Sequence, residues 1–378
     1  MERQTEYELI DELLALKQAG MPFLDATQEQ NPVAHYFDED RFAAETDALF
    51  RALPMIAAHA SELPEAGSFL RREIGGRSVL LTRDADRQIH AFLNVCRHRG
   101  TRLVDAEAGC AKRFSCPYHA WTYGSNGALL AAPHFETGFP DSDKAKLGLT
   151  RLPVLEKFGF VWVIAAPDSK AQIADYFAGL GAELDALAID DMVIAEQTNE
   201  RRKANWKILI EGGIEAYHFK IAHRSTIGPY FEDNLSTYRC FGPHIRSVLA
   251  RNTVAGLADA PRDTWRLRDH ANLLYTLFPT STFLVQQDHI VWVSQMPVSA
   301  GETDIRLATL VPQARRDEKQ YWARNHAITT TTLDEDFAIG ESIQSALASG
   351  ANEQMTFGRY EGALARFNAT IADYINAA

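Results

Sequence analysis

Two short stretches of the chain decide its fold: residues 94–100 read NVCRHRG and residues 114–121 read FSCPYHAW. Each stretch holds one cysteine and one histidine close together, and these four residues are Cys96, His98, Cys116 and His119. Two thiols and two imidazoles on a pair of short loops form a donor set for a metal. The spacing disfavours the alternative of buried cysteines and surface histidines that fall together by chance.

The arrangement of the two pairs distinguishes between metals. Zinc accepts two cysteines and two histidines, but zinc fingers usually group a cysteine pair and then a histidine pair. Here each loop carries a mixed pair, which suits a [2Fe–2S] cluster of the Rieske kind, where one iron takes both thiolates and the other takes both imidazoles. Zinc stays the alternative. The remaining cysteines, Cys110 and Cys240, have no partner histidine and are interpreted as ordinary free thiols.

The residues around these loops predict a small all-β domain. From residue 68 to residue 166, short runs rich in β-branched and aromatic residues alternate with turn residues such as Gly75-Gly76. Elsewhere, helical spacing of apolar residues predicts helices at about 6–18, 40–52, 171–190, 315–347 and 359–376.

The second half of the chain mixes helical and strand-like patterns. Residues 205–223 read as the end of a strand that leads into a helix. Residues 273–312 contain three strand-like runs followed by the run DIRLATLVP. An antiparallel sheet with helices from both ends of the segment, an α+β arrangement, is therefore expected.

A second group of candidate ligands lies at residues 211–223, EGGIEAYHFKIAH. It contains Glu215, His218 and His223, and two histidines with an acid are the ligand set of a mononuclear non-haem Fe(II) site with open positions for O₂. On a straight helix five residues turn through about 140°, so the two imidazoles cannot point the same way. We therefore expect the helix to bend, bulge or end near residues 220–222. Two unrelated histidines are the alternative.

The third ligand of such a site must come from elsewhere. The best segment is residues 333–337, LDEDF, where three acids stand in a row. Acids at a helix start are also favourable to the helix dipole, so the sequence alone leaves that simpler interpretation open.

The order of these motifs resembles one known family. Along the chain come the two Cys/His pairs, the NWK at residues 205–207, the run from Glu211 to His223, and a helix with Asp336, Glu341 and Gln344. In this order they resemble the large (α) subunit of the Rieske non-haem iron oxygenases, the ring-hydroxylating oxygenase family. The resemblance covers nearly the whole chain, from about residue 42 to the C-terminal helix.

The resemblance implies a fold and a domain order. It implies an α+β protein with N-terminal helices at residues 1–48 that pack on the catalytic domain. A small all-β Rieske [2Fe–2S] domain would follow at residues 49–166. A helix-grip catalytic domain, with an antiparallel sheet and flanking helices, would occupy residues 167–378.

The resemblance also implies roles for individual residues. The cluster ligands would be Cys96, His98, Cys116 and His119. His218 and His223 match the two iron histidines. Asp336 matches the iron carboxylate, because its spacings to Glu341 and Gln344 fit the family pattern.

Glu215 matches the acid that links an iron histidine to His98 or His119 of the neighbouring subunit. This implies a homotrimer, with a β subunit as a further possibility. A carboxylate in that position also fixes the tautomer of the histidine it contacts. A solvated helix acid is the alternative interpretation of Glu215.

Three positions depart from the common family pattern. Many members have Asp where this chain has Glu215, and Glu there resembles a branch that includes several oxygenases of quaternary ammonium compounds. Gly212 stands where Asn is common. Ala120 replaces the glycine that usually follows the second Rieske histidine.

Composition excludes some classes of function. The chain has 378 residues and a net charge of −12, which argues against sequence-independent binding to nucleic acid or an anionic membrane. Its N-terminus lacks a basic segment followed by an apolar one, so we expect no secretory signal and a cytoplasmic protein. It has no G-x-G-x-x-G or Walker loop. Electrons would therefore come from a separate NAD(P)H-dependent flavin reductase, directly or through a ferredoxin.

We predict the oxygenase component of a multicomponent system that uses O₂ to hydroxylate a small aromatic or apolar substrate. Oxidation or N-demethylation of a quaternary ammonium compound is the alternative within the same class. A zinc-bearing, ligand-binding helix-grip protein is the alternative of another class.

Aromatic residues near the candidate iron ligands could cage a methylated ammonium or simply pack a core. They are Tyr217, Phe219, Tyr230, Phe231, Tyr238, Phe241, Tyr275, Phe278, Phe283 and Trp292. Three other histidines, His244, His270 and His289, are interpreted as structural or pocket residues rather than metal ligands.

Overall fold

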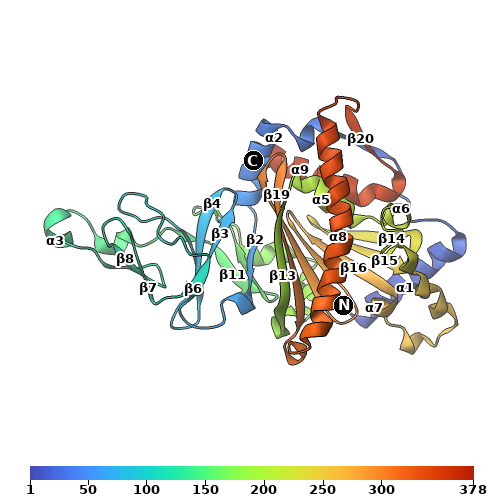
Figure 1. Ribbon diagram of the computed structural model, residues 1–378, viewed down its shortest axis with the longest axis horizontal. Coiled ribbons are helices and arrows are strands. Elements are labelled where there is room, and N and C mark those ends of the chain that lie inside the picture. The colour runs from blue at the N-terminus through green and yellow to red at the C-terminus, as the bar shows by residue number, and fades with distance from the viewer. The chain divides into compact units, whose positions relative to one another are not determined.

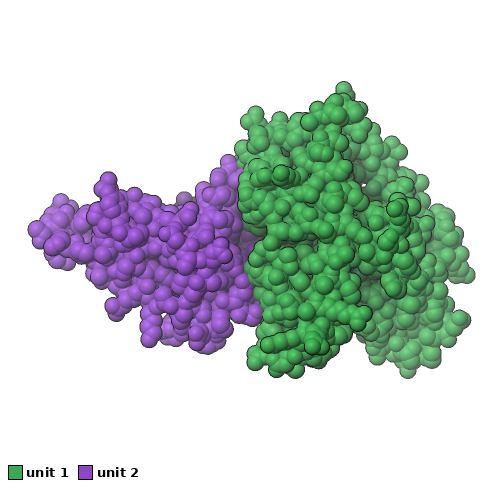
Figure 2. Space-filling view, in the orientation of Figure 1, with its two compact units in different colours: residues 1–45, 177–378 green, residues 46–176 purple.

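The computed structural model describes residues 1–378 and divides into two compact units (Figure 2). Unit 1 comprises Met1–Glu45 and Phe177–Ala378, and unit 2 comprises Thr46–Tyr176. The N-terminal segment therefore belongs to the same unit as the C-terminal half of the chain. No helix is both long and apolar enough to cross a membrane.

Unit 2 is built from short antiparallel strands, which confirms the predicted all-β domain (Figure 1). Its sheets have the strand orders β10-β5-β4-β3-β6, β11-β12-β2 and β7-β8-β9. The strands are β2 Met55–His59, β3 Ser68–Ile74, β4 Arg77–Arg83, β5 Ile89–Leu93, β6 Ala108–Cys110, β7 Arg113–Ser115, β8 Thr122–Gly124, β9 Leu129–Ala131, β10 Arg151–Leu152, β11 Val154–Lys157 and β12 Phe160–Val163. The unit has one single-turn α-helix, α3 (Phe135–Gly138). Strands β3 and β4 are joined at Gly75-Gly76, where both φ angles are positive, a conformation that glycine adopts without strain.

Unit 1 contains a seven-stranded antiparallel sheet with the order β13-β19-β18-β17-β16-β15-β14. Its strands are β13 Met192–Arg202, β14 Phe231–Phe241, β15 His244–Arg251, β16 Ala271–Leu277, β17 Ser281–Val285, β18 Ile290–Ser299 and β19 Glu302–Pro312. The strand-like runs of residues 273–312 correspond to β16 to β19. The sequence pattern missed β13, β14 and β15. Strands β13 and β14 are the sheet edges, where polar and charged side chains are tolerated, and the apolar residues of the interior strand β15 are interrupted by Arg246 and Ser247. A small second sheet pairs β1 (Glu29–Pro32) with β20 (Gln354–Phe357).

Helices cover this sheet, and the longest, α8 (Lys319–Leu347), lies across its face (Figure 1). The others are α1 Arg3–Ala19, α2 Glu39–Glu45, α4 Gly181–Asp185, α5 Trp206–Ile214, α6 Phe219–Ala222, α7 Leu267–His270 and α9 Gly362–Ala377. Helix α8 packs on α5. The two helices come close at Gly340, where an added Cβ would lie 2.8 Å from the Leu209 side chain.

Two predictions for the helices are wrong. Residues 171–190 form three short helical pieces instead of one helix, because Gly179 adopts a left-handed φ of +85° that interrupts it. Residues 205–223 contain no strand end, because β13 already ends at Arg202 and Asn205 caps α5 by accepting a hydrogen bond from the Lys207 N–H.

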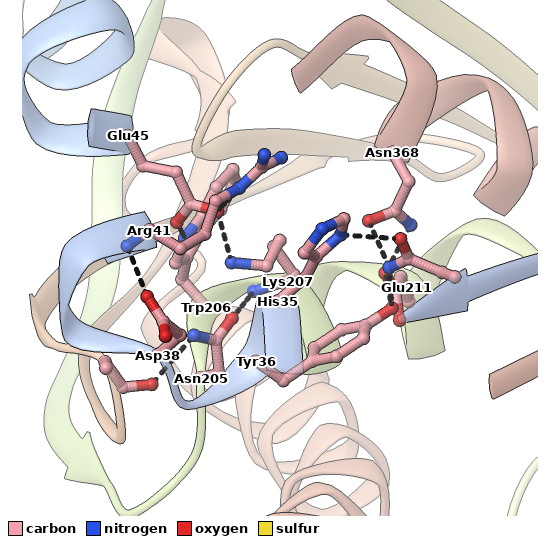
Figure 3. A network of polar contacts seen from close by, with 12 residues as sticks. His35, Tyr36, Asp38, Arg41, Glu45, Asn205, Trp206, Lys207, Glu211 and Asn368 are labelled. Atoms are coloured by element: carbon pink, nitrogen blue, oxygen red, sulfur yellow. Dashed lines mark hydrogen bonds and ion pairs between the residues drawn. The ribbon is translucent and has the colours of Figure 1, made fainter. Parts of the chain in front are cut away.

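A buried ion pair joins the N-terminal segment to helix α5 (Figure 3). Lys207 Nζ lies 2.6 Å from Glu45 Oε1, and their side chains are 1% and 0% exposed. Glu45 also accepts a hydrogen bond from Trp206 Nε1 at 2.9 Å and pairs with Arg41 at 3.3 Å. Burial lowers the pKa of Lys207, and Glu45 opposes that effect. Glu45 is thus the counter-charge that keeps the buried ammonium ionised.

Glu45→Gln should lower the free energy of unfolding by about 3–5 kcal/mol, because it leaves Lys207 buried without a counter-charge. Urea denaturation followed by tryptophan fluorescence measures the change. Asp304→Asn is the matched control, because its pair with Arg201 is about half exposed on both sides and solvent screens the attraction, so little stability should be lost. Equal losses in the two variants would contradict the role assigned to the buried pair.

Candidate metal centres

Two loops of unit 2 with the same backbone geometry carry the Cys/His pairs. In the first, the Gly100 N–H donates to the Cys96 carbonyl at 3.0 Å, and in the second the Ala120 N–H donates to the Cys116 carbonyl at 3.0 Å. Gly100 and Ala120 have φ angles of +77° and +57°. Ala120 therefore keeps the turn of the glycine that the resemblance led us to expect, at a cost of about 1–2 kcal/mol for a side chain in the left-handed region.

The donors of these loops have the properties that a cluster requires. The imidazoles of His98 and His119 lie with their ring centroids 4.6 Å apart, and Cys96 and Cys116 form no disulfide and are buried in one apolar cluster. The Nδ1 atoms of both histidines are buried and have no hydrogen-bond partner. A buried nitrogen without a partner is costly, and ligation of a metal removes that cost. Two thiols and two free Nδ1 atoms fit a Rieske [2Fe–2S] cluster.

Two aromatic residues support this centre, and the sequence analysis missed both. The Trp121 ring stacks on His98 with centroids 4.8 Å apart and planes 8° apart. The Tyr123 hydroxyl lies 3.4 Å from Cys96 Sγ and accepts a hydrogen bond from the Arg97 N–H at 3.0 Å. Because its oxygen accepts from Arg97, the Tyr123 O–H is free to donate to the sulfur of Cys96.

Tyr123→Phe should lower the reduction potential of the cluster. A hydrogen bond to a ligating sulfur favours the reduced, more negative state, and the variant removes that bond. Redox titration followed by circular dichroism or EPR measures the potential. Tyr118→Phe is the control, because that exposed ring contacts Arg99 and His119 but no cysteine. An unchanged potential in Tyr123→Phe would show that the hydroxyl does not act on the cluster.

The second group of ligands meets between α5, α6 and α8. Helix α5 ends at Ile214, His218 precedes the single turn of α6, and His223 follows it. The irregularity expected from the five-residue spacing is therefore confirmed. Asp336 Oδ1 on α8 lies 2.9 Å from His223 Nε2 and 3.4 Å from His218 Nε2. All three ligand atoms lie within 4.8 Å of one another, so the three side chains could hold a metal ion.

Each histidine of this group is held through its other ring nitrogen. Glu215 contacts Nδ1 of His218, and Glu335 Oε2 lies 2.7 Å from Nδ1 of His223. Glu335 also accepts a hydrogen bond from the Thr226 hydroxyl at 2.6 Å. These carboxylates direct both Nε2 atoms toward Asp336. The acidic run 333–337 pointed to Glu335 as a residue near the site, but no sequence pattern assigned it to His223.

The electrostatics of the group suit a bound cation. Burial opposes protonation of His218, but Asp336 and Glu215 outweigh burial and raise its pKa to about 10. Burial likewise opposes protonation of His223, whose pKa is nevertheless raised by Asp336 and Glu335. The pKa of Asp336 is lowered, because the two histidines outweigh its burial. Three carboxylates contact the two imidazoles of this group, so a divalent cation can occupy the site in place of protons.

Two cavities open on this group, and Asp336 and Gly212 line both. The first, of about 790 Å³, also contains His223 and an apolar wall of Phe219, Phe231, Leu249, Leu274 and Leu284. The second, of about 680 Å³, contains Glu211, Glu215, His218, Ile339 and Ile343. At Gly212 an added Cβ would meet no atom within 4 Å, so the missing asparagine leaves room in both cavities.

Most of the other residues singled out in the sequence lie away from the site. Of the ten aromatic residues, Phe219, Tyr230 and Phe231 line the 790 Å³ cavity. The three additional histidines each use Nδ1 within the protein, as expected of structural residues: His244 with the Phe278 N–H, His270 with Thr253 and His289 with Asp288. Cys110 and Cys240 are free and exposed.

A β domain with a mixed cysteine and histidine donor set, followed by a helix and sheet domain with two histidines and a carboxylate, defines the Rieske non-haem iron class. Residues 54–153 match the Rieske [2Fe-2S] domain family. Residues 189–377, half of the chain, match the catalytic domain of the ring hydroxylating alpha subunit. The chain therefore belongs to the ring-hydroxylating oxygenase α-subunit family.

Characterised relatives cover most of the chain. It is 29% identical over 357 residues to the glycine betaine monooxygenase oxygenase subunit of Pseudomonas aeruginosa. This alignment covers 85% of this chain and 82% of the relative. It is 34% identical over 197 residues to the large oxygenase component of naphthalene 1,2-dioxygenase from Ralstonia, covering 50% of this chain and 44% of the relative. The crystal structure of the quaternary ammonium Rieske monooxygenase CntA with its substrate γ-butyrobetaine superposes with a TM-score of 0.75 at 25% identity, over 93% and 96% of the two chains.

Membership of this family establishes the class of reaction. The chain is the oxygenase component of a Rieske system, an oxidoreductase that incorporates oxygen from O₂. Its cofactors are a Rieske [2Fe–2S] cluster and a mononuclear iron, and its electrons arrive from a reductase or ferredoxin. The zinc-bearing, ligand-binding alternative is thereby excluded.

Asp336→Ala should abolish binding of the mononuclear iron and leave the cluster in place, because the variant removes one of three candidate iron ligands, whereas the four candidate cluster ligands all belong to unit 2. Metal analysis together with the visible spectrum measures the two cofactors separately. Asp334→Ala is the matched control on the same helix, since Asp334 is exposed and pairs with Arg202. Full iron occupancy in Asp336→Ala would assign the third ligand to another residue.

Proposed function

We propose that this oxygenase oxidises a small aromatic or otherwise apolar organic substrate bound in the 790 Å³ cavity. The observation that carries the proposal is that His223 and Asp336 share this cavity with the apolar wall of Phe219, Phe231 and their neighbours. A cavity of this size whose exposed surface is mostly apolar is typical of a small-molecule site. The wall would keep water away from a metal held by His223 and Asp336, and it would hold the apolar part of the substrate beside these residues.

We assign the cluster to Cys96, His98, Cys116 and His119, and the iron to His218, His223 and Asp336. Held by these residues, the cluster would supply an electron and the iron would offer open positions for O₂. The chain itself contributes orientation. Glu215 and Glu335 hold the imidazoles with Nε2 toward Asp336, which fixes the tautomer that ligates a metal.

We further propose that the active assembly is a homotrimer in which electrons pass between subunits. Glu215 would contact His218 within one chain and His98 or His119 of the partner subunit. The mouth of the 680 Å³ cavity, which contains Glu215 and His218, carries the exposed apolar residues Ile339 and Ile343. In unit 2, the exposed Tyr118 ring lies against His119 with centroids 3.7 Å apart. Exposed apolar groups beside both donor sets suit burial in an interface. A β subunit is not required by this arrangement.

The reductant would be NAD(P)H, delivered by a separate flavin reductase with or without a ferredoxin. The chain has no dinucleotide-binding motif of its own. Hydroxylation then consumes O₂, two electrons and two protons, places one oxygen atom in the substrate and releases the other as water. Dihydroxylation would place both atoms in the substrate.

A quaternary ammonium compound is the second candidate substrate. Three aromatic side chains, Phe219, Tyr230 and Phe231, line the cavity, and aromatic faces attract methylated ammonium groups. The glycine betaine and CntA relatives act on such compounds. Phe219 and Phe231 pack edge to face with centroids 5.2 Å apart, however, and so form a closed wall rather than an open cage. This packing favours the apolar substrate.

The first experiment is spectroscopic. The purified protein should be red-brown when oxidised. After reduction with dithionite under nitrogen it should give a rhombic Rieske EPR signal. Substrate-dependent O₂ consumption with a surrogate reductase then compares monocyclic arenes with trimethylammonium compounds. A protein with a normal cluster that consumes O₂ only with the trimethylammonium compounds would replace the first substrate class by the second.

Glu215→Gln should retain both metals and lower turnover by at least about 10–100-fold, because an amide cannot bridge two imidazoles as a carboxylate does. Steady-state oxidation and metal analysis measure the two quantities. Glu335→Gln is the control, because Glu335 holds the other iron histidine and has no proposed bridging role. Equal losses of turnover in both variants would show that Glu215 only orients His218 and does not bridge to the cluster.

A co-assembly experiment tests the path between subunits directly. Cys116→Ser removes the cluster and Asp336→Ala removes the iron, so each homo-oligomer should be inactive. Mixed oligomers of the two variants should recover activity, because a cluster on one subunit can then serve the iron on another. Inactive mixtures of well-formed oligomers would rule out transfer between subunits.

A further inference from the structure

The 790 Å³ cavity contains a partly buried arginine that the rest of the site does not use. Arg251 is the last residue of β15 and pairs with Phe231 of β14 across the sheet. Its guanidinium lies 6.0 Å from the centre of the Phe231 ring. Arg251 therefore lies beside the apolar wall, in the same cavity as His223 and Asp336.

Arg251 has no carboxylate partner in the chain. Its Nε and Nη2 atoms both donate to the side-chain oxygen of Asn272, at 3.3 and 2.7 Å. Three other partly buried arginines are paired with acids, Arg83 with Glu156, Arg202 with Glu200 and Arg246 with Glu183, whereas Arg268 donates to the Gln286 carbonyl. Asn272 orients the planar guanidinium but cannot neutralise it.

Partial burial makes the positive charge of Arg251 unfavourable in free energy. Burial lowers the pKa of Arg251, and Asp269, on the same cavity, opposes this effect only in part. Asp269 is itself exposed and accepts a hydrogen bond from Gln287 at 2.8 Å. A half-buried cation held in a fixed direction by a neutral amide gains most from an anion supplied by a ligand.

We infer that Arg251 binds a carboxylate of the substrate, so that the substrate is a carboxylic acid with an apolar body. The inference rests on the proposed function, which makes this cavity the substrate site. The guanidinium would take the carboxylate while the wall of Phe219, Leu249 and Leu274 takes the apolar part. Arylalkanoic acids fit this description, and so do betaine-type zwitterions, which carry a carboxylate at one end.

Arg251 would thus determine specificity by rejecting uncharged analogues. A site built to bind a charged group discriminates strongly against a ligand that lacks it, because the protein group is then left unpaired. Arg324 also lines the cavity but is exposed, so water already satisfies its charge. Loss of Arg251 should therefore weaken binding of a carboxylate ligand, whereas loss of Arg324 should not.

Isothermal titration calorimetry on the anaerobic holoenzyme tests the inference with two pairs of probes. The pairs are 3-phenylpropanoate with 3-phenylpropanamide, and γ-butyrobetaine with its amide. At least one carboxylate should bind about 10–100-fold more tightly than its amide. In Arg251→Gln the ratio of the amide and carboxylate dissociation constants should fall to near one. Arg251→Lys should give an intermediate ratio, since lysine keeps the positive charge but lacks the planar pair of N–H donors.

Arg324→Gln is the control and should keep the full preference for the carboxylate. The ratio of two dissociation constants within one variant is insensitive to a partial loss of folded protein. Equal binding of acid and amide by the wild type, failure of both carboxylates to bind, or an unchanged ratio in Arg251→Gln would each overturn the inference. Calorimetry needs no turnover, so carboxylate binding that depends on Arg251 in a protein that never consumes O₂ would overturn the proposed function alone.

Discussion

The contact between Asp336 and two histidines is the constraint on which the chemistry of unit 1 depends. Its Oδ1 atom lies 2.9 Å from His223 Nε2 and 3.4 Å from His218 Nε2, although α8 is far from α6 in the sequence. The contact requires α8 to lie tightly on α5, which a glycine at position 340 permits. Helix α5 is in turn fixed at its start by the buried ion pair of Lys207.

The site is asymmetric about this carboxylate. His223 faces the apolar cavity of about 790 Å³, His218 faces the cavity of about 680 Å³, and Asp336 lines both. Each histidine has its own supporting carboxylate, Glu335 for the first and Glu215 for the second. On our proposals, the substrate meets the iron from the side of His223 and electrons reach it from the side of His218. This separation lets substrate specificity vary without disturbing the path for electrons.

Much of the fold and part of the site were predictable from local patterns. The alternation of short apolar runs predicted the β domain, and the apolar runs at residues 273–312 predicted four of the seven strands of the large sheet. The five-residue spacing of the histidines predicted the break at α6. Edge strands β13 and β14 were missed because an edge strand tolerates polar and charged residues, and β15 was missed because Arg246 and Ser247 interrupt its apolar residues. The single helix predicted at residues 171–190 was wrong because the spacing of apolar residues does not report the left-handed turn at Gly179.

The sequence by itself determined which donor groups the protein carries. Two mixed cysteine and histidine pairs, and two histidines with nearby acids, are chemical statements that hold whatever the fold. Only the tertiary structure decided which acid meets which histidine, that Tyr123 contacts Cys96, and that Arg251 stands in the cavity without a counter-charge. These facts depend on distances between residues that are remote along the chain. Local periodicity does not encode such distances, because they are set by how helices and strands pack on one another.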